Sequence, residues 1–110
     1  MSEYYSKDHL PKFAEIAEGN KDLADKFFKY YGSVFEDGAL SPREKALIAL
    51  AVSHTIQCPY CIDAYTTACL EKGSDIEQMT EAVNVATAIR GGASLVHGIQ
   101  MLENAKKKGM

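Results

Sequence analysis

The chain of 110 residues is long enough for one domain with a modest core, so we expect a single domain over residues 1–110. Hydrophobic residues make up 46% of it, a high share for so small a chain, which indicates apolar surface covered by another subunit. The net charge of −3 excludes the basic composition of nucleic-acid-binding proteins, and the longest apolar run, residues 46–52, is far shorter than the roughly 20 residues that cross a bilayer. With no apolar export segment at its beginning, the chain is expected in the cytoplasm, without nucleic acid or membrane as a partner.

The N-terminal third predicts two helices. The first is short and ends at Gly19, and its apolar face consists of Leu10, Phe13, Ile16 and Ala17. The second begins after Asn20, a good capping residue, and ends at Gly32. Its apolar side chains follow the spacing of one helix face and are Leu23, Ala24, Phe27, Tyr30 and Tyr31. We interpret the tyrosine pairs as packing residues and residues 32–40 as a loop.

A capping box, Ser-Pro-Arg-Glu at residues 41–44, begins the next helix. This helix is predicted over residues 42–56, and it is apolar on every side across residues 46–52, which is typical of a central, buried helix. A helix that carries the cysteines follows over residues 59–72. Gly73 stands where a left-handed C-terminal cap is expected.

A second capping box, Ser-Asp-Ile-Glu at residues 74–77, begins a further helix. Its apolar face consists of Ile76, Met79, Val83, Ala86 and Ile89. Gly91 and Gly92 either break the chain or allow a very close helix approach. The last apolar stripe consists of Leu95, Val96, Ile99 and Leu102. No segment alternates as a strand does, so the sequence predicts an all-α fold of about six helices.

The strongest chemical signal is the motif Cys58-Pro59-Tyr60-Cys61. Proline suits the first helical position, which puts Cys58 at the helix N-cap and Cys61 in the first turn. Two thiols within about one turn can close a disulfide, and a helix N-terminus favours a negatively charged sulfur. We therefore predict a dithiol that cycles. A zinc site, which usually takes four ligands, and a structural disulfide, which reducing compartments disfavour, are the alternatives.

Two side chains that can carry a proton stand one helical turn from the cysteine pair, His54 before it and Tyr65 after it. Peroxide chemistry needs such groups, because the attacking sulfur must be a thiolate and the leaving oxygen must be protonated. Each also has an ordinary explanation, as a histidine bonded to a carbonyl and as an aromatic packing residue. Glu44 serves the capping box and is a further candidate, whereas Cys69 is expected in the core.

Three segments occur in order along the chain: SPREKALIALAVS at residues 41–53, QCPYCIDA at 57–64 and RGGASLVHG at 90–98. Together they resemble the carboxymuconolactone decarboxylase-like superfamily, and more narrowly its alkylhydroperoxidase D-like branch. The similarity covers about residues 40–104. The combination of three segments is specific, whereas the cysteine motif alone would not be.

The resemblance implies an all-helical subunit that assembles into a symmetric homo-oligomer, a trimer or hexamer. By the pattern of the peroxidase branch, Cys61 would be the peroxidatic cysteine and Cys58 the resolving one. The substrate would be a hydroperoxide, and the reductant a dithiol carrier such as a lipoyl domain or a thioredoxin-like protein. No metal and no other cofactor is implied.

Two positions depart from the family pattern. The peroxidase motif CxxCxxxH has its histidine where this chain has Tyr65, a poor base at neutral pH. The position of the family's acidic residue is Ala46 here, and the nearest carboxylate is that of Glu44. We predict from the spacing that His54 takes over part of the proton relay. A non-redox lyase of the same superfamily, which needs no cysteine pair, and a non-enzymatic thiol sensor or ligand-binding protein remain the alternatives.

Overall fold

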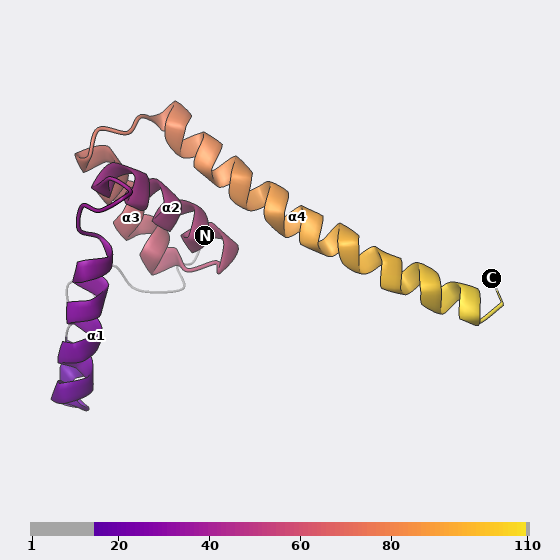
Figure 1. The fold of residues 1–110 in the computed structure, drawn as a ribbon, viewed down its shortest axis with the longest axis horizontal. Coiled ribbons are helices and arrows are strands. Elements are labelled where there is room, and N and C mark those ends of the chain that lie inside the picture. Colours follow the sequence, from indigo (N-terminus) through magenta and orange to yellow (C-terminus); the bar gives the residue numbers. More distant parts are fainter. Residues whose placement is uncertain (1–14, 110) are drawn as a thin grey trace.

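The computed structural model describes residues 15–109, which contain four α-helices (Figure 1). These are α1 (Lys21–Val34), α2 (Pro42–Thr55), α3 (Pro59–Glu71) and α4 (Ile76–Lys107). No strand occurs within the described residues, and the prediction of an all-α fold is confirmed. In the same part of the chain, no helix has the length and apolar character that a membrane span requires.

The number of helices differs from the predicted six at two places. Residues 10–14 of the first predicted helix lie outside the described residues, and residues 15–18 form a short 3₁₀ turn. Gly91 and Gly92 do not break the chain, because α4 runs through them as one helix of 32 residues. A Cβ built at either glycine meets no other atom within 4 Å, so no close helix approach occurs there within the protomer.

The first capping box is confirmed. The Ser41 hydroxyl accepts the Glu44 backbone N–H at 3.1 Å, and the Glu44 carboxylate accepts the Ser41 N–H at 2.8 Å. Pro42 occupies the first turn, where its missing N–H costs no hydrogen bond. The local sequence therefore fixes where α2 begins.

We expect Ser41→Ala to lower the free energy of unfolding by about 1 kcal/mol, because it leaves an N–H at the start of α2 without its acceptor. Urea unfolding followed by circular dichroism measures the change. Ser33→Ala, an exposed serine within α1, is the matched control and should cost less. Equal losses in the two variants would show that the capping box contributes nothing specific.

The second capping box begins one residue later than predicted, at Asp75 rather than Ser74. The Asp75 carboxylate accepts the Gln78 N–H at 2.8 Å, and the Gln78 side chain accepts the Asp75 N–H at 3.0 Å. Ser74 is already used by the end of α3, since its N–H donates to the Cys69 carbonyl at 2.9 Å. With Gly73 in the left-handed region, at φ 89°, this is the hydrogen-bond pattern that closes a helix C-terminus.

Helix α2 is the central element, and it packs against both α3 and α4. Its Ala46 and Leu50 are 2% exposed and form the core with the fully buried Cys69 of α3. The predicted burial holds for this face of α2. Ile48 and Val52 on another face are each 49% exposed in the protomer.

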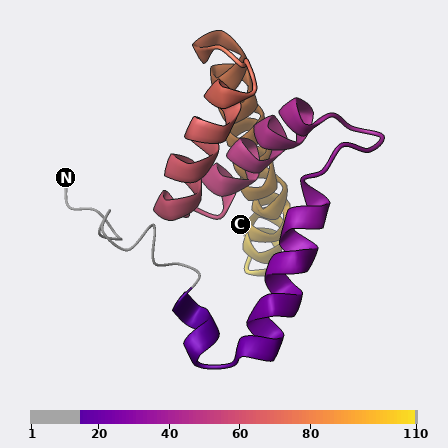
Figure 2. The same ribbon diagram turned by 90° about the vertical axis from the view of Figure 1, so that its left-hand side faces the viewer.

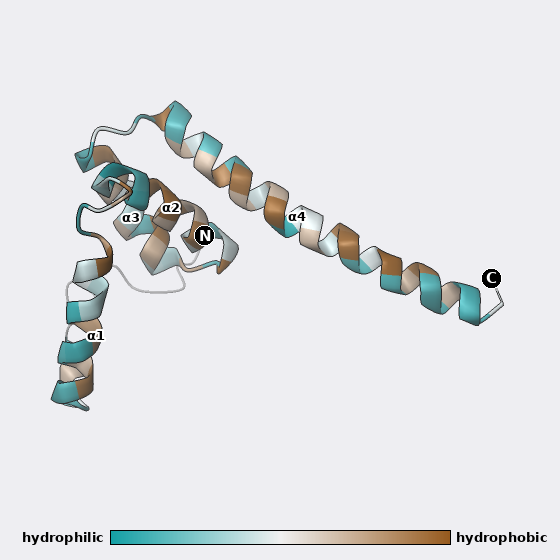
Figure 3. Cartoon of the chain, viewed as in Figure 1, coloured by the Kyte–Doolittle hydropathy of each residue, from teal (hydrophilic) through white to brown (hydrophobic). Residues whose placement is uncertain are grey.

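The protomer is elongated, because α4 runs from the helical body far into solvent (Figure 1). Helix α1 also leads away from α2 and α3 (Figure 2). Its radius of gyration is 18.7 Å, whereas a compact domain of this size has about 13 Å. Apolar residues recur along α4 almost to its C-terminal end (Figure 3). The large ones that lie exposed beyond Gly92 are Leu95, Val96, Ile99, Met101 and Leu102. Apolar surface of this extent is typical of an interface.

Candidate functional site

The cysteine pair lies where the chain turns from α2 into α3. Gln57 has a φ of 55°, in the left-handed region that residues other than glycine seldom occupy. The next residue, Cys58, donates its N–H to the carbonyl of Ser53 at 3.1 Å. The first thiol is therefore held against the C-terminal end of α2.

The two sulfurs are organised by the start of α3. Cys58 is the N-cap residue, Pro59 is the first helical residue, and the Cys58 Sγ accepts the backbone N–H of Cys61 at 3.2 Å. Both cysteines are half-buried free thiols. The predicted placement of the pair at a helix N-terminus is confirmed.

The second thiol is held in its protonated form. Burial, followed by its hydrogen bond to Cys58 and the negative charge that Cys58 can carry, raises the pKa of Cys61 to about 11. The hydrogen bond counts against ionisation because the Cys61 thiol donates to the neighbouring sulfur, which already receives an N–H. Burial and Cys58 therefore outweigh the helix N-terminus in setting the protonation state of Cys61.

A cavity of about 490 Å³, which we call the Cys61 cavity, opens beside this thiol. Helix α2 and its C-cap residue supply most of its aliphatic wall, with Ile48, Ala49, Val52 and Ile56. Its aromatic side chains are Tyr31, Phe35 and Tyr65. Cys61 lines the cavity, whereas Cys58 is not among its lining residues. The apolar wall and the single thiol suit a small organic molecule that reacts at Cys61.

An aromatic ladder joins α1 to α3 across this cavity. The ring of Phe35 lies 5.3 Å from that of Tyr31 and stacks on Tyr65 at 5.4 Å, with 21° between the last two planes. Lys45 of α2 holds the same segment, because its amine donates to the carbonyls of Val34 and Glu36 at 2.8 and 2.6 Å. The first link joins the C-terminal end of α1 to α3, and the second joins it to α2.

Tyr31 is the site residue that the sequence did not single out. Burial, followed by the negative charge that Cys61, Tyr60 and Cys58 can carry, raises its pKa. The sequence assigns Tyr31 only a packing role, because nothing local indicates that the C-terminal end of α1 lines the same cavity as Cys61. The one available signal is the four-residue spacing of Phe27, Tyr31 and Phe35, which predicts a continuous aromatic face.

His54 and Glu44 lie apart from the Cys61 cavity. The His54 ring lines a separate hollow of about 260 Å³ between α2, α3 and α4, and its Nδ1 is 2.8 Å from the Leu50 carbonyl. Glu44 is fully exposed, and the hydrogen bonds from Ser41 lower its pKa. Of the candidates beside the cysteines, only Tyr65 shares a cavity with Cys61.

Ser53 is a second site residue that the sequence analysis passed over. It is 2% exposed, lines the Cys61 cavity, and its hydroxyl donates to the Ala49 carbonyl at 2.6 Å. A lone serine at the end of an otherwise apolar helical run was the available signal.

Cys69 is fully buried, as expected, and burial raises its pKa. Among residues 15–109, no three side chains of His, Cys, Asp and Glu gather as metal ligands would.

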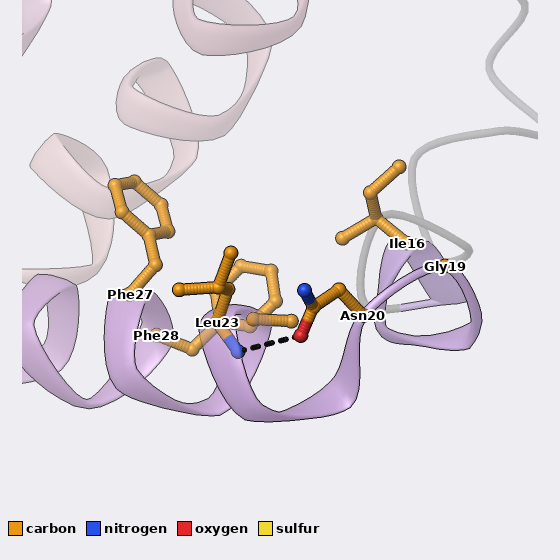
Figure 4. A pocket seen from close by; sticks show the side chains of 7 residues that line it. Ile16, Gly19, Asn20, Leu23, Phe27 and Phe28 are labelled. Atoms are coloured by element: carbon orange, nitrogen blue, oxygen red, sulfur yellow. Dashed lines mark hydrogen bonds between the residues drawn. The ribbon is translucent and has the colours of Figure 1, made fainter.

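A third hollow, of about 440 Å³, lies at the N-terminal end of α1 (Figure 4). Ile16, Leu23, Phe27 and Phe28 line it, together with Asn20, whose side chain accepts the Leu23 N–H at 3.1 Å. Its lining residues within the described part of the chain include no thiol, carboxylate or imidazole.

The sequence and the fold of this chain are similar to those of known proteins. A Paracoccus denitrificans protein named uncharacterized protein 4 in cox locus is 39% identical over 88 residues, which cover 80% of this chain and 79% of that protein. A crystal structure from Methanobacterium thermoautotrophicum matches with a TM-score of 0.75 and 29% identity, over 78% of this chain and 97% of the other.

A crystal structure from Thermotoga maritima shares the fold, with a TM-score of 0.63 over 94% of this chain and all of the other, at 23% identity. The model of the carboxymuconolactone decarboxylase family matches residues 21–104, which include α1, α2, α3 and most of α4. The helical order, the cysteine turn and this match lead to one conclusion: the chain belongs to the carboxymuconolactone decarboxylase family.

Proposed function

We propose that the chain is a thiol-dependent peroxidase of the alkylhydroperoxidase D-like branch, in which Cys58 and Cys61 cycle between dithiol and disulfide. The observation that carries the proposal is the pairing of two free thiols at the start of α3, one of which faces an apolar cavity. Cys61 is the attacking residue because it lines the cavity. Cys58 is the resolving residue because its sulfur adjoins Cys61 and does not line the cavity.

The proposed cycle transfers two electrons from the thiols to the substrate. The Cys61 thiolate attacks the terminal oxygen of a hydroperoxide, so that an S–O bond forms, the O–O bond breaks and the departing alkoxide takes a proton. Cys58 then attacks the resulting sulfenic acid, forming the disulfide and releasing water. An external dithiol carrier, such as a lipoyl domain or a thioredoxin-like protein, returns the pair to the reduced state.

The raised pKa of Cys61 limits this chemistry at neutral pH, because a thiol with a pKa of about 11 is a thiolate only in about one molecule in 10⁴ at pH 7. The tyrosine at the family's histidine position, Tyr65, favours the second candidate, a thiol sensor that is oxidised once and slowly. The wider proposal includes a homo-oligomer, trimer or hexamer, in the cytoplasm, where reducing partners keep the pair as thiols.

Consumption of tert-butyl hydroperoxide with dihydrolipoamide as reductant tests the peroxidase. We expect multiple turnovers by the wild-type chain and none by Cys61→Ser or Cys58→Ser. A sulfenic acid should be trapped by dimedone at Cys61 in the Cys58→Ser variant, because the resolving thiol is gone. Cys69→Ala is the matched control and should keep turnover, since its thiol is buried in the core away from the cavity.

Turnover that persists in Cys61→Ser would overturn the proposal. Dimedone trapping at Cys58 in the Cys61→Ser variant, with none at Cys61 in the Cys58→Ser variant, would overturn it as well. A wild-type chain that forms the Cys58–Cys61 disulfide once, without turnover, is a sensor. If hydroperoxide oxidises neither cysteine of the wild-type chain, both the peroxidase and the sensor are contradicted.

A further inference from the structure

The Cys61 cavity needs a proton donor for the departing alkoxide, and the imidazole candidate is not in it. His54 lines another hollow, and the family's histidine position holds Tyr65. The cavity wall of the described chain contains two phenols, those of Tyr31 and Tyr65. They lie on either side of Phe35, whose ring contacts both.

We infer that Tyr31 of α1 is the general acid of the proposed peroxidase, donating its phenolic proton to the alkoxide as the O–O bond breaks. The inference rests on the proposed function. It assigns a catalytic role to a helix that lies outside the family-like motifs at residues 41–53, 57–64 and 90–98.

Tyr65 lines the same cavity and is the rival that the test below decides. Three observations favour Tyr31 over Tyr60 and Tyr30. It lines the same cavity as Cys61, and negative charge at either sulfur is felt at its hydroxyl. Tyr60 is coupled to the same two sulfurs but is not among the residues that line the cavity. Tyr30 is 67% exposed and lines no part of the cavity.

The chemistry of a phenol fits the role of an acid rather than a base. The raised pKa of Tyr31 keeps it protonated across the physiological range, so it cannot remove a proton from Cys61. An alkoxide is far more basic than a phenolate, so transfer from the phenol to the departing oxygen is downhill. The phenolate that results is returned to its protonated form by water once the alcohol has left. Burial of Tyr31, which raises its pKa, favours that return.

The test varies the leaving group. A thiolate that attacks tert-butyl hydroperoxide expels an alkoxide and needs an acid, whereas attack on peracetic acid expels a stable carboxylate and needs none. Iodoacetamide loses iodide and reports only the thiolate. Single-turnover oxidation or alkylation of Cys61 is measured with each reagent by mass spectrometry, in the wild-type chain and in Tyr31→Phe, Tyr65→Phe and Tyr30→Phe.

We expect Tyr31→Phe to slow the reaction with tert-butyl hydroperoxide about 100-fold, and to change the reactions with peracetic acid and iodoacetamide by less than about threefold. The ring contacts with Phe27 and Phe35 need no hydroxyl, so the variant retains the packing of α1. Tyr30→Phe should match the wild type with all three reagents.

Equal losses with all three reagents would overturn the inference, because they would show a structural role for Tyr31. A leaving-group-dependent loss in Tyr65→Phe but not in Tyr31→Phe would move the acid to the family's histidine position and equally overturn it. The two levels of the proposal stay distinguishable. If the wild-type chain does not react with tert-butyl hydroperoxide, the peroxidase fails. If it reacts and Tyr31→Phe behaves as Tyr30→Phe does, only the assignment of the acid fails.

Discussion

Alkylation of Cys61 by iodoacetamide should accelerate about tenfold for each pH unit between roughly pH 7 and pH 10, a change of about 10³ overall. The reason is that the reactive species is the thiolate, and the pKa of Cys61 is raised to about 11 by burial and by Cys58. The thiolate fraction therefore grows through the whole range and levels off only above it. Mass spectrometry of the Cys58–Cys61 peptide separates the two alkylation sites.

Cys58→Ala should lower the pKa of Cys61 and raise its alkylation rate at neutral pH, because it removes both the sulfur that accepts the thiol hydrogen and the opposing charge. Burial remains, so the pKa should not fall below that of an ordinary thiol.

His54→Gln is the companion variant. Its ring lies in a separate hollow, so we now expect the profile of Cys61 to stay unchanged. A profile shifted by His54→Gln would support the relay that its spacing predicts, and a plateau near pH 8.5 in the wild type would contradict the raised pKa.

Leu95→Glu should convert the proposed oligomer into monomers. Leu95 is 79% exposed in the protomer and begins the last apolar stripe of α4, so an interface that uses this stripe would have to cover it. Burying a leucine contributes roughly 1.5–3 kcal/mol, and an unpaired carboxylate in its place costs several kcal/mol for every subunit. Light scattering after size-exclusion chromatography at micromolar concentration measures the change.

Asn104→Glu is the matched control for this variant. Helical spacing places Asn104 on the side of α4 opposite Leu95, Ile99 and Leu102, so the same added charge should leave the assembly intact. Circular dichroism should show that Leu95→Glu keeps its helices, because Leu95 has few contacts to lose within the protomer. A wild-type chain that is already monomeric would contradict the proposed oligomer.

The helices and their ends were largely predictable because the signals that set them are local. The capping box at Ser41, the N-cap at Cys58 and the glycine cap at Gly73 each depend on residues within one turn. The errors came where two local signals compete. Ser74 has the sequence of an N-cap, but the closure of α3 uses it first. The glycine pair at residues 91–92 lowers helix propensity without ending α4.

The site was predictable only where it lies on one stretch of chain. Cys58, Cys61 and Tyr65 share α3 or its N-cap, so their spacing places them together. His54 also has the right spacing, but the rotation of α2 that buries Leu50 directs the imidazole into a different hollow. Tyr31 enters the cavity from another helix. Its position depends on how α1 packs through Phe35 and Lys45, which no pattern within α1 encodes.

The small core of the protomer has a consequence for how stability should be measured. Within residues 15–109, the buried apolar residues are Ala46, Leu50, Cys69 and Ala86, while α4 exposes its apolar stripe to water. In the proposed oligomer, association of copies would supply much of the folding free energy by mass action, so we expect the melting temperature to rise with protein concentration. Stabilities of variants are therefore comparable only at one fixed concentration of protomer.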